Sequence, residues 1–282
     1  MGQQLGGEDT LLQVWLPGLR DGLRRTEPKL AEADLPGPGD VGCAFYGDLF
    51  RPSGTKTKTG GVPPYDALDV EDEFERALLD AWWREAARVD PGSVPDPAAA
   101  KKLRTPQAVQ RALNALSGSR FFAGMAERAL IFALKQVRWY FENSEIRAAA
   151  RQRVAEAIDG DTQLLIGHSL GSVVAYEALA AHPEWSVRAF VSLGSPLGVR
   201  GLIFDRLEPA PHEGTGAWPG SIRSWVNIAD QGDVVALEKR LGTRFGDRVV
   251  DVLVHNGARA HDVRPYLTAK ETGDAVRAGL GR

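Results

Sequence analysis

Short apolar runs alternate with longer stretches of helical pattern along the chain, and this alternation predicts an α/β fold. Runs of strand length that are rich in β-branched and aromatic residues are typical of buried strands. We expect such strands at Val41–Tyr46, Gln163–Ile166, Val187–Leu193, Ser224–Ala229 and Val249–Val254. Because helical stretches separate them, we expect crossover connections and a mostly parallel sheet that is flanked by helices.

The helical pattern is clearest at Asp9–Arg25, Val70–Val89 and Phe121–Phe141, and a final helix is expected to start near Pro265. We interpret residues 1–282 as a single domain, within which about 52–145 form a helical insertion, or cap. Apolar side chains occur almost all round Phe121–Phe141, which favours a buried helix. The alternative is a lid over a lipophilic substrate pocket.

The most informative motif is Gly167–Gly171, with the sequence Gly-His-Ser-Leu-Gly. A lone G-x-S-x-G pattern is weak, but this one joins an expected strand to an expected helix. The two glycines let the strand end and the helix start approach each other without Cβ clashes, so a sharp turn can expose the Ser169 hydroxyl. We therefore predict Ser169 as a nucleophile. A serine that merely caps a helix, the alternative, would need neither glycine.

A nucleophilic serine needs a histidine base, and the histidine needs a carboxylate. Parallel sheets gather such groups at the carboxyl ends of their strands, in the chain order serine, acid, histidine. Asp233 follows the fourth expected strand and is our choice for the acid, with Asp230 as the rival. His261 follows the fifth strand and is our choice for the base, because His255 lies at the very end of that strand and is interpreted as structural.

Composition, charge and cysteine content limit the classes of function that the sequence supports. The net charge of −3, with 43% apolar and 25% charged residues, is ordinary for a globular protein and gives no nucleic-acid footprint. The single cysteine, Cys43, cannot form an internal disulfide and fits a reducing compartment. We find no membrane-spanning run and no secretory signal, so we expect a cytoplasmic protein. Nothing in the sequence indicates an oligomeric state.

Metal and cofactor chemistry find little support in the sequence. The histidines lack H-x-x-x-H and H-x-H spacing, and no P-loop is present, because the glycine-rich stretch Gly2–Gly7 follows no strand and precedes no lysine. We therefore expect no cofactor and no metal.

With Ser169, Asp233 and His261 in this order, the chain resembles the α/β-hydrolase superfamily. It is most similar to the bacterial serine esterase/lipase-like branch related to GPI-inositol-deacylase-type lipases. The similarity includes Leu193–Leu197, Trp225–Val235, and Tyr266-Leu267 behind His261, and it covers the C-terminal half best.

This resemblance implies an acyl-enzyme hydrolase of carboxylic esters, with a small-molecule or lipid-like ester as substrate and the Leu170 N–H as an oxyanion donor. Thioesterases, peptidases and acyltransferases use the same triad, and a non-catalytic binding module with the hydrolase fold is a further alternative.

The chain departs from this family at its start. Related hydrolases carry a strand that ends in a His-Gly-x-Gly-type motif, whose N–H groups supply half of the oxyanion hole. Met1–Gln4 is similar to the tail of that motif, which makes Gln3 the candidate second donor, but the strand is missing. It would lie between the strands expected at Val41–Tyr46 and Gln163–Ile166, and its loss leaves backbone groups unpaired. Three explanations stay open: the true start lies upstream, which we favour for the gene; the two flanking strands close the gap; or another segment or chain fills it.

Overall fold

The computed structural model describes residues 6–51, 62–97, 103–122 and 125–281. Within these residues one parallel four-stranded sheet forms, in the order β1-β2-β3-β4. Its strands match the second to fifth predicted strands, and their bounds are Leu164–His168 (β1), Ala189–Leu193 (β2), Ser224–Asp230 (β3) and Val249–Val254 (β4). The predicted α/β class with a parallel sheet flanked by helices is confirmed.

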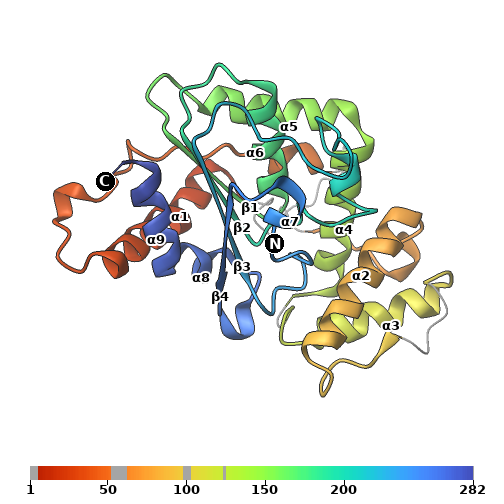
Figure 1. Cartoon of the computed structure of the whole chain (residues 1–282). Coiled ribbons are helices and arrows are strands. Elements are labelled where there is room, and N and C mark those ends of the chain that lie inside the picture. Colours follow the sequence, from red (N-terminus) through yellow and green to blue (C-terminus); the bar gives the residue numbers. More distant parts are fainter. Residues whose placement is uncertain (1–5, 52–61, 98–102, 123–124, 282) are drawn as a thin grey trace.

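The sheet is buried on both faces, because alternate side chains of one strand enter different cores. On β2, Phe190 packs into the core on one face, whereas Val191 and Leu193 pack into the core on the other. Helices α1, α8 and α9 gather on the second face, at the left of Figure 1, and α5 and α6 cover the first. Their bounds are Glu8–Thr26 (α1), Ser144–Ala157 (α5), Leu170–Ala181 (α6), Val263–Thr268 (α8) and Lys270–Gly279 (α9).

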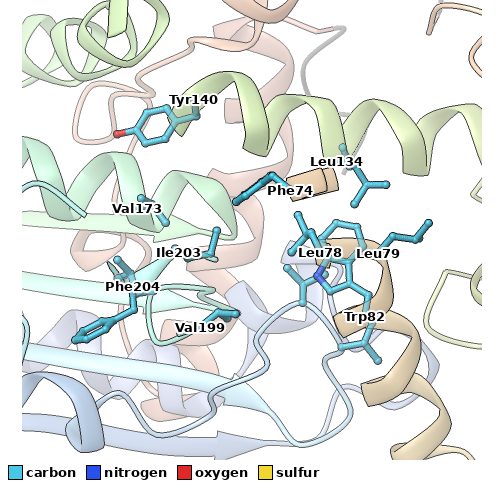
Figure 2. Close-up of a cluster of buried hydrophobic side chains, with 14 of the residues drawn as sticks. Phe74, Leu78, Leu79, Trp82, Leu134, Tyr140, Val173, Val199, Ile203 and Phe204 are labelled. Atoms are coloured by element: carbon cyan, nitrogen blue, oxygen red, sulfur yellow. The ribbon is translucent and has the colours of Figure 1, made fainter. Parts of the chain in front are cut away.

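A further group of helices packs beside α6 (Figure 1). It comprises α2 (Glu73–Val89) and α4 (Glu127–Glu142), which the sequence predicted, and α3 (Pro106–Ser117), which it did not. The short α7 (Gly242–Phe245) precedes β4. Figure 2 shows side chains of α2 and α4 in one buried cluster with Val173 of α6 and Ile203. The expected helix over Phe121–Phe141 begins later, at Glu127, and is buried along much of its length. In the described residues, no helix is both long enough and apolar enough to span a membrane.

The strand predicted at Val41–Tyr46 is wrong. No backbone N–H of this segment donates to a backbone carbonyl of the described residues. A strand forms only when a neighbouring strand takes up its hydrogen bonds. Among the residues that the structure describes, the nearest predicted neighbour, β1, pairs only with β2. β1 and Val41–Tyr46 line a common cavity of about 1170 Å³. The two flanking segments therefore do not close the gap that the sequence predicted.

Close packing of α1 against α8 and α9 leads to a first prediction. A Cβ on Gly22 of α1 would lie 2.4 Å from the carbonyl oxygen of Leu267. In an unobstructed helix, glycine to alanine stabilises by about 1 kcal/mol. Because the obstacle here is backbone, we expect Gly22→Ala to lower the free energy of unfolding by about 1–3 kcal/mol in urea titrations. Gly160→Ala, where a Cβ meets no atom within 4 Å, is the control and should change little. A stabilised Gly22→Ala would contradict this packing.

Candidate active site

Ser169 occupies a strained turn between β1 and α6. Its φ of 54° and ψ of −132° are values that residues other than glycine rarely adopt. The turn is sharp because the flanking backbone is in close contact: a Cβ on Gly167 would lie 2.6 Å from the Cα of Ser172. The Ser169 N–H donates to the carbonyl of Leu193 at 3.0 Å, which joins the turn to the end of β2. The hydroxyl is thereby presented at the carboxyl end of β1.

A second serine, Ser172, stabilises this turn through hydrogen bonds. The buried Ser172 hydroxyl lies 2.6 Å from the Ser169 carbonyl oxygen and 2.7 Å from the Ser195 hydroxyl. The Leu197 N–H donates to the Ser195 hydroxyl at 3.2 Å. These contacts connect the serine turn to the loop after β2, so the turn is held on two sides.

Of the three side chains predicted to act together, His261 lies within hydrogen-bonding distance of both Ser169 and Asp233. His261 Nε2 is 2.9 Å from Ser169 Oγ, and His261 Nδ1 is 2.8 Å from Asp233 Oδ2. A carboxylate only accepts hydrogen bonds, so Nδ1–H donates to Asp233 and Nε2 is left to accept from the serine hydroxyl. Asp233 is fully buried and His261 is 6% exposed. This arrangement keeps the network largely out of water.

Asp233 is held as a carboxylate despite its burial. Burial by itself raises the pKa of this group, but the neighbouring His261 and then Lys239 outweigh burial and hold the pKa below its usual value. Asp233 Oδ1 accepts the N–H groups of Val235 at 2.9 Å and Ala236 at 3.3 Å. The Lys239 ammonium donates to the Asp233 carbonyl. Opposite charge and N–H donors thus compensate for lost hydration.

Tyr266 is a hydrogen-bond partner of Asp233. From the sequence, it is only a residue that follows His261. Its hydroxyl donates to Asp233 Oδ2 and accepts the N–H of Asp230, both at 2.8 Å. Burial and then the charge of Asp233 raise the pKa of Tyr266 well above its ordinary value, so the hydroxyl keeps its proton. The approach depends on Gly194, whose φ is +52°, because a Cβ there would lie 2.7 Å from Asp233 Oδ2. No pattern in the sequence distinguishes Tyr266 from other buried tyrosines.

Asp230, the rival acid, has a different set of partners. Its carboxylate accepts the N–H of Gly232 at 2.6 Å and the N–H of Asn256. It therefore connects the loop after β3 to the loop after β4. The geometry favours Asp233 over Asp230 as the partner of His261.

His168, within the serine motif, packs against the base. The ring centroids of His168 and His261 lie 4.8 Å apart, and His168 Nε2 is 3.1 Å from the His261 carbonyl oxygen. A carbonyl only accepts, so Nε2 of His168 carries a proton and donates it. Burial and then the proximity of His261 lower the pKa of His168 well below its ordinary value, so the ring is neutral.

Of the two predicted oxyanion donors, the structure describes Leu170 but not Gln3. Leu170 is the first residue of α6, where an N–H has no acceptor within the helix, and it lines the cavity beside Ser169. Gln3 lies outside the described residues.

His255, which the sequence analysis interpreted as structural, is exposed. No group of three or more His, Cys, Asp or Glu within the described residues could hold a metal ion.

The chain matches no family model, and no significant match to it is found among curated proteins or solved structures. The functional interpretation therefore depends on the contacts among Ser169, His261 and Asp233.

The neutral, half-buried His168 predicts a loss of stability in acid. Below about pH 6.5 the unfolded chain binds a proton at this residue that the folded protein excludes. Its contribution to stability is complete above that pH and falls by up to about 1.4 kcal/mol per pH unit as the pH decreases. In urea titrations from about pH 7.5 to 5, His168→Gln should lose less stability than the wild type. The exposed His212 provides the control, His212→Gln. Equal pH slopes for the wild type and His168→Gln would contradict a neutral His168 ring.

Proposed function

We propose that this protein is a serine hydrolase with the α/β-hydrolase fold, which cleaves carboxylic esters through an acyl-enzyme. One observation carries the proposal: the continuous hydrogen-bonded series of Ser169, His261 and Asp233. These residues follow β1, β4 and β3, at the ends of parallel strands where such sites are built. The strained backbone of Ser169 is a second support, because strain in an ordered turn is typical of functional sites.

The contacts support one sequence of steps. His261 Nε2 removes the hydroxyl proton as Ser169 Oγ attacks the ester carbonyl, and Asp233 stabilises the resulting imidazolium. The Leu170 N–H donates to the oxyanion of the tetrahedral intermediate. His261 then gives its proton to the leaving alcohol, which completes the acyl-enzyme. Water, activated by the same histidine, releases the acid and restores Ser169.

The surroundings of Ser169 favour an apolar acyl group. The cavity that contains Ser169 is lined in part by apolar side chains from α2, α4 and the loops after β2 and β3: Leu78, Trp82, Val137, Pro196, Val199, Ile203 and Val235. Apolar walls with few polar groups bind hydrocarbon by removing its surface from water. In this proposal α2 and α4 form the cap over the acyl site, and the substrate is a small-molecule or lipid-like ester.

Active-site labelling tests the nucleophile. A fluorophosphonate should attach to Ser169, because only an activated serine reacts with it. His261→Ala should slow attachment at least about a hundredfold. His255→Ala changes the exposed histidine after the same strand and should react like the wild type. Intact-mass spectrometry and peptide mapping give rate and site. Folded protein that stays unlabelled would disprove the proposal and favour a non-catalytic binding module.

A matched pair of variants tests the acid. Asp233→Asn should lower kcat for an aryl ester by about 10⁴, since an amide cannot hold the imidazole in the required tautomer. Asp230→Asn keeps an acceptor for the loop N–H groups and should lower kcat by less than about tenfold, with a lower Tm. Steady-state kinetics and thermal unfolding measure the two effects. A larger loss of kcat in Asp230→Asn would reverse the assignment.

A further inference from the structure

Trp82 of α2 is a buried residue whose indole N–H has no hydrogen-bond partner in the part of the chain that the structure describes. Its side chain is 2% exposed. The indole N–H groups of Trp83, Trp218 and Trp225, by contrast, each donate to an oxygen at 2.9 Å. Buried indoles usually find such an acceptor, because an unpaired donor that is removed from water costs free energy. The unpaired N–H of Trp82 therefore calls for an acceptor from outside the chain.

This indole borders the proposed acyl site. Trp82 lines the cavity that contains Ser169, together with Leu78 one turn earlier on α2 and with Val199 and Ile203 after β2. In Figure 2 the indole nitrogen of Trp82 lies on the side of the ring that faces Val199. The unpaired donor is thus directed at the apolar wall of the site.

Contacts with two other segments hold the indole in place. Its ring packs on that of Phe122, with the ring centroids 6.0 Å apart. Glu85, one turn later on α2, lies 3.3 Å from the Lys239 ammonium, which also donates to the Asp233 carbonyl. α2 is therefore joined to the loop that carries the proposed acid, and the indole N–H keeps a fixed position relative to that loop.

Water is a poor partner for this N–H. A buried water molecule needs at least about two polar partners. Leu78 and Leu79, which Figure 2 shows close to the indole, are apolar. Among the described residues of α2 and α4 that line the cavity, the other polar side chain is that of Gln136, which is half-buried. An acceptor that belongs to the ligand needs no further polar partner, because the apolar walls hold the rest of the molecule.

We propose that the ester cleaved at Ser169 carries an oxygen acceptor on its acyl chain, a keto or hydroxyl group that accepts a hydrogen bond from Trp82. This inference rests on the proposed function, because it places the acyl chain against α2 and α4. An indole N–H only donates, so it recognises an acceptor and contributes nothing to the binding of a plain hydrocarbon chain. A site with a buried donor disfavours analogues that lack the acceptor, because the donor then stays unpaired.

Matched esters test this selectivity. The substrates are aryl esters of hexanoic acid and of its oxo derivatives, with the keto group at each successive carbon of the chain. Each kcat/KM is divided by the rate of hydrolysis of the same ester in hydroxide, which removes differences in intrinsic reactivity. One oxo isomer should then exceed the hexanoate at least about fivefold.

Two tryptophan variants assign the selectivity to one N–H. Trp82→Phe keeps an apolar ring but lacks the donor, so the corrected ratio of oxo ester to hexanoate should fall to about one. Trp83→Phe makes the same change at the next residue, whose N–H already donates to the Pro95 carbonyl, and should keep the wild-type ratio. Equal ratios for all esters in the wild type would overturn the inference even where Trp82→Phe does not fold.

A binding measurement does not depend on catalysis. The probes are the isomers of hexanone, added to isotope-labelled protein, with hexane as the hydrocarbon control. The indole N–H resonance of Trp82 is identified in NMR spectra by its loss in Trp82→Phe. It should move downfield with a ketone and much less with hexane, because only the ketone accepts a hydrogen bond.

The outcomes separate this inference from the proposed function. A ketone-specific shift without any ester hydrolysis would support the acceptor site and count against the hydrolase. Ester hydrolysis with equal corrected ratios and no ketone-specific shift would support the hydrolase and overturn the inference. Selectivity for an oxo ester that persists in Trp82→Phe would also overturn it, because another group would then recognise the acceptor.

Discussion

The buried charge of Asp233 is the constraint on which the site depends. A carboxylate removed from water is stable only when donors and opposite charge surround it. Here the donors come from three places: the backbone of its own loop, His261 after β4, and Tyr266 of α8. Satisfying one charge therefore determines how three segments of the chain meet. The same contacts direct the free nitrogen of His261 at the serine.

The strained turn at Ser169 is kept in place by contacts with the residues around it. A residue with positive φ destabilises its turn by about 1–3 kcal/mol, which the rest of the structure must offset. Contacts with the end of β2 and with the buried Ser172 hold the turn in place. The neutral ring of His168 adds support by donating to the backbone of the base. These hydrogen bonds thus hold the backbone of Ser169 in a conformation that the turn alone would not keep.

The sheet combines a well-supported interior with an unusual edge. β2 and β3 each pair on both sides and are almost wholly buried. β1 carries the sequence of an interior strand, but it lines the cavity and is only half-buried. The same cavity contains Ser169, so this edge of the sheet borders the proposed site.

Periodicity and local motifs determined much of this protein. Strands β1 to β4, helices α1, α2 and α4, and the serine turn were all predictable, because each is specified by residues close together in the chain. Chain order and strand ends also indicated Asp233 and His261. Only tertiary structure decided between Asp233 and Asp230, brought Tyr266 to the carboxylate, and left Val41–Tyr46 outside the sheet that the described residues form. Those outcomes depend on what lies across the sheet, and an apolar run becomes a strand only where a neighbouring backbone accepts its hydrogen bonds.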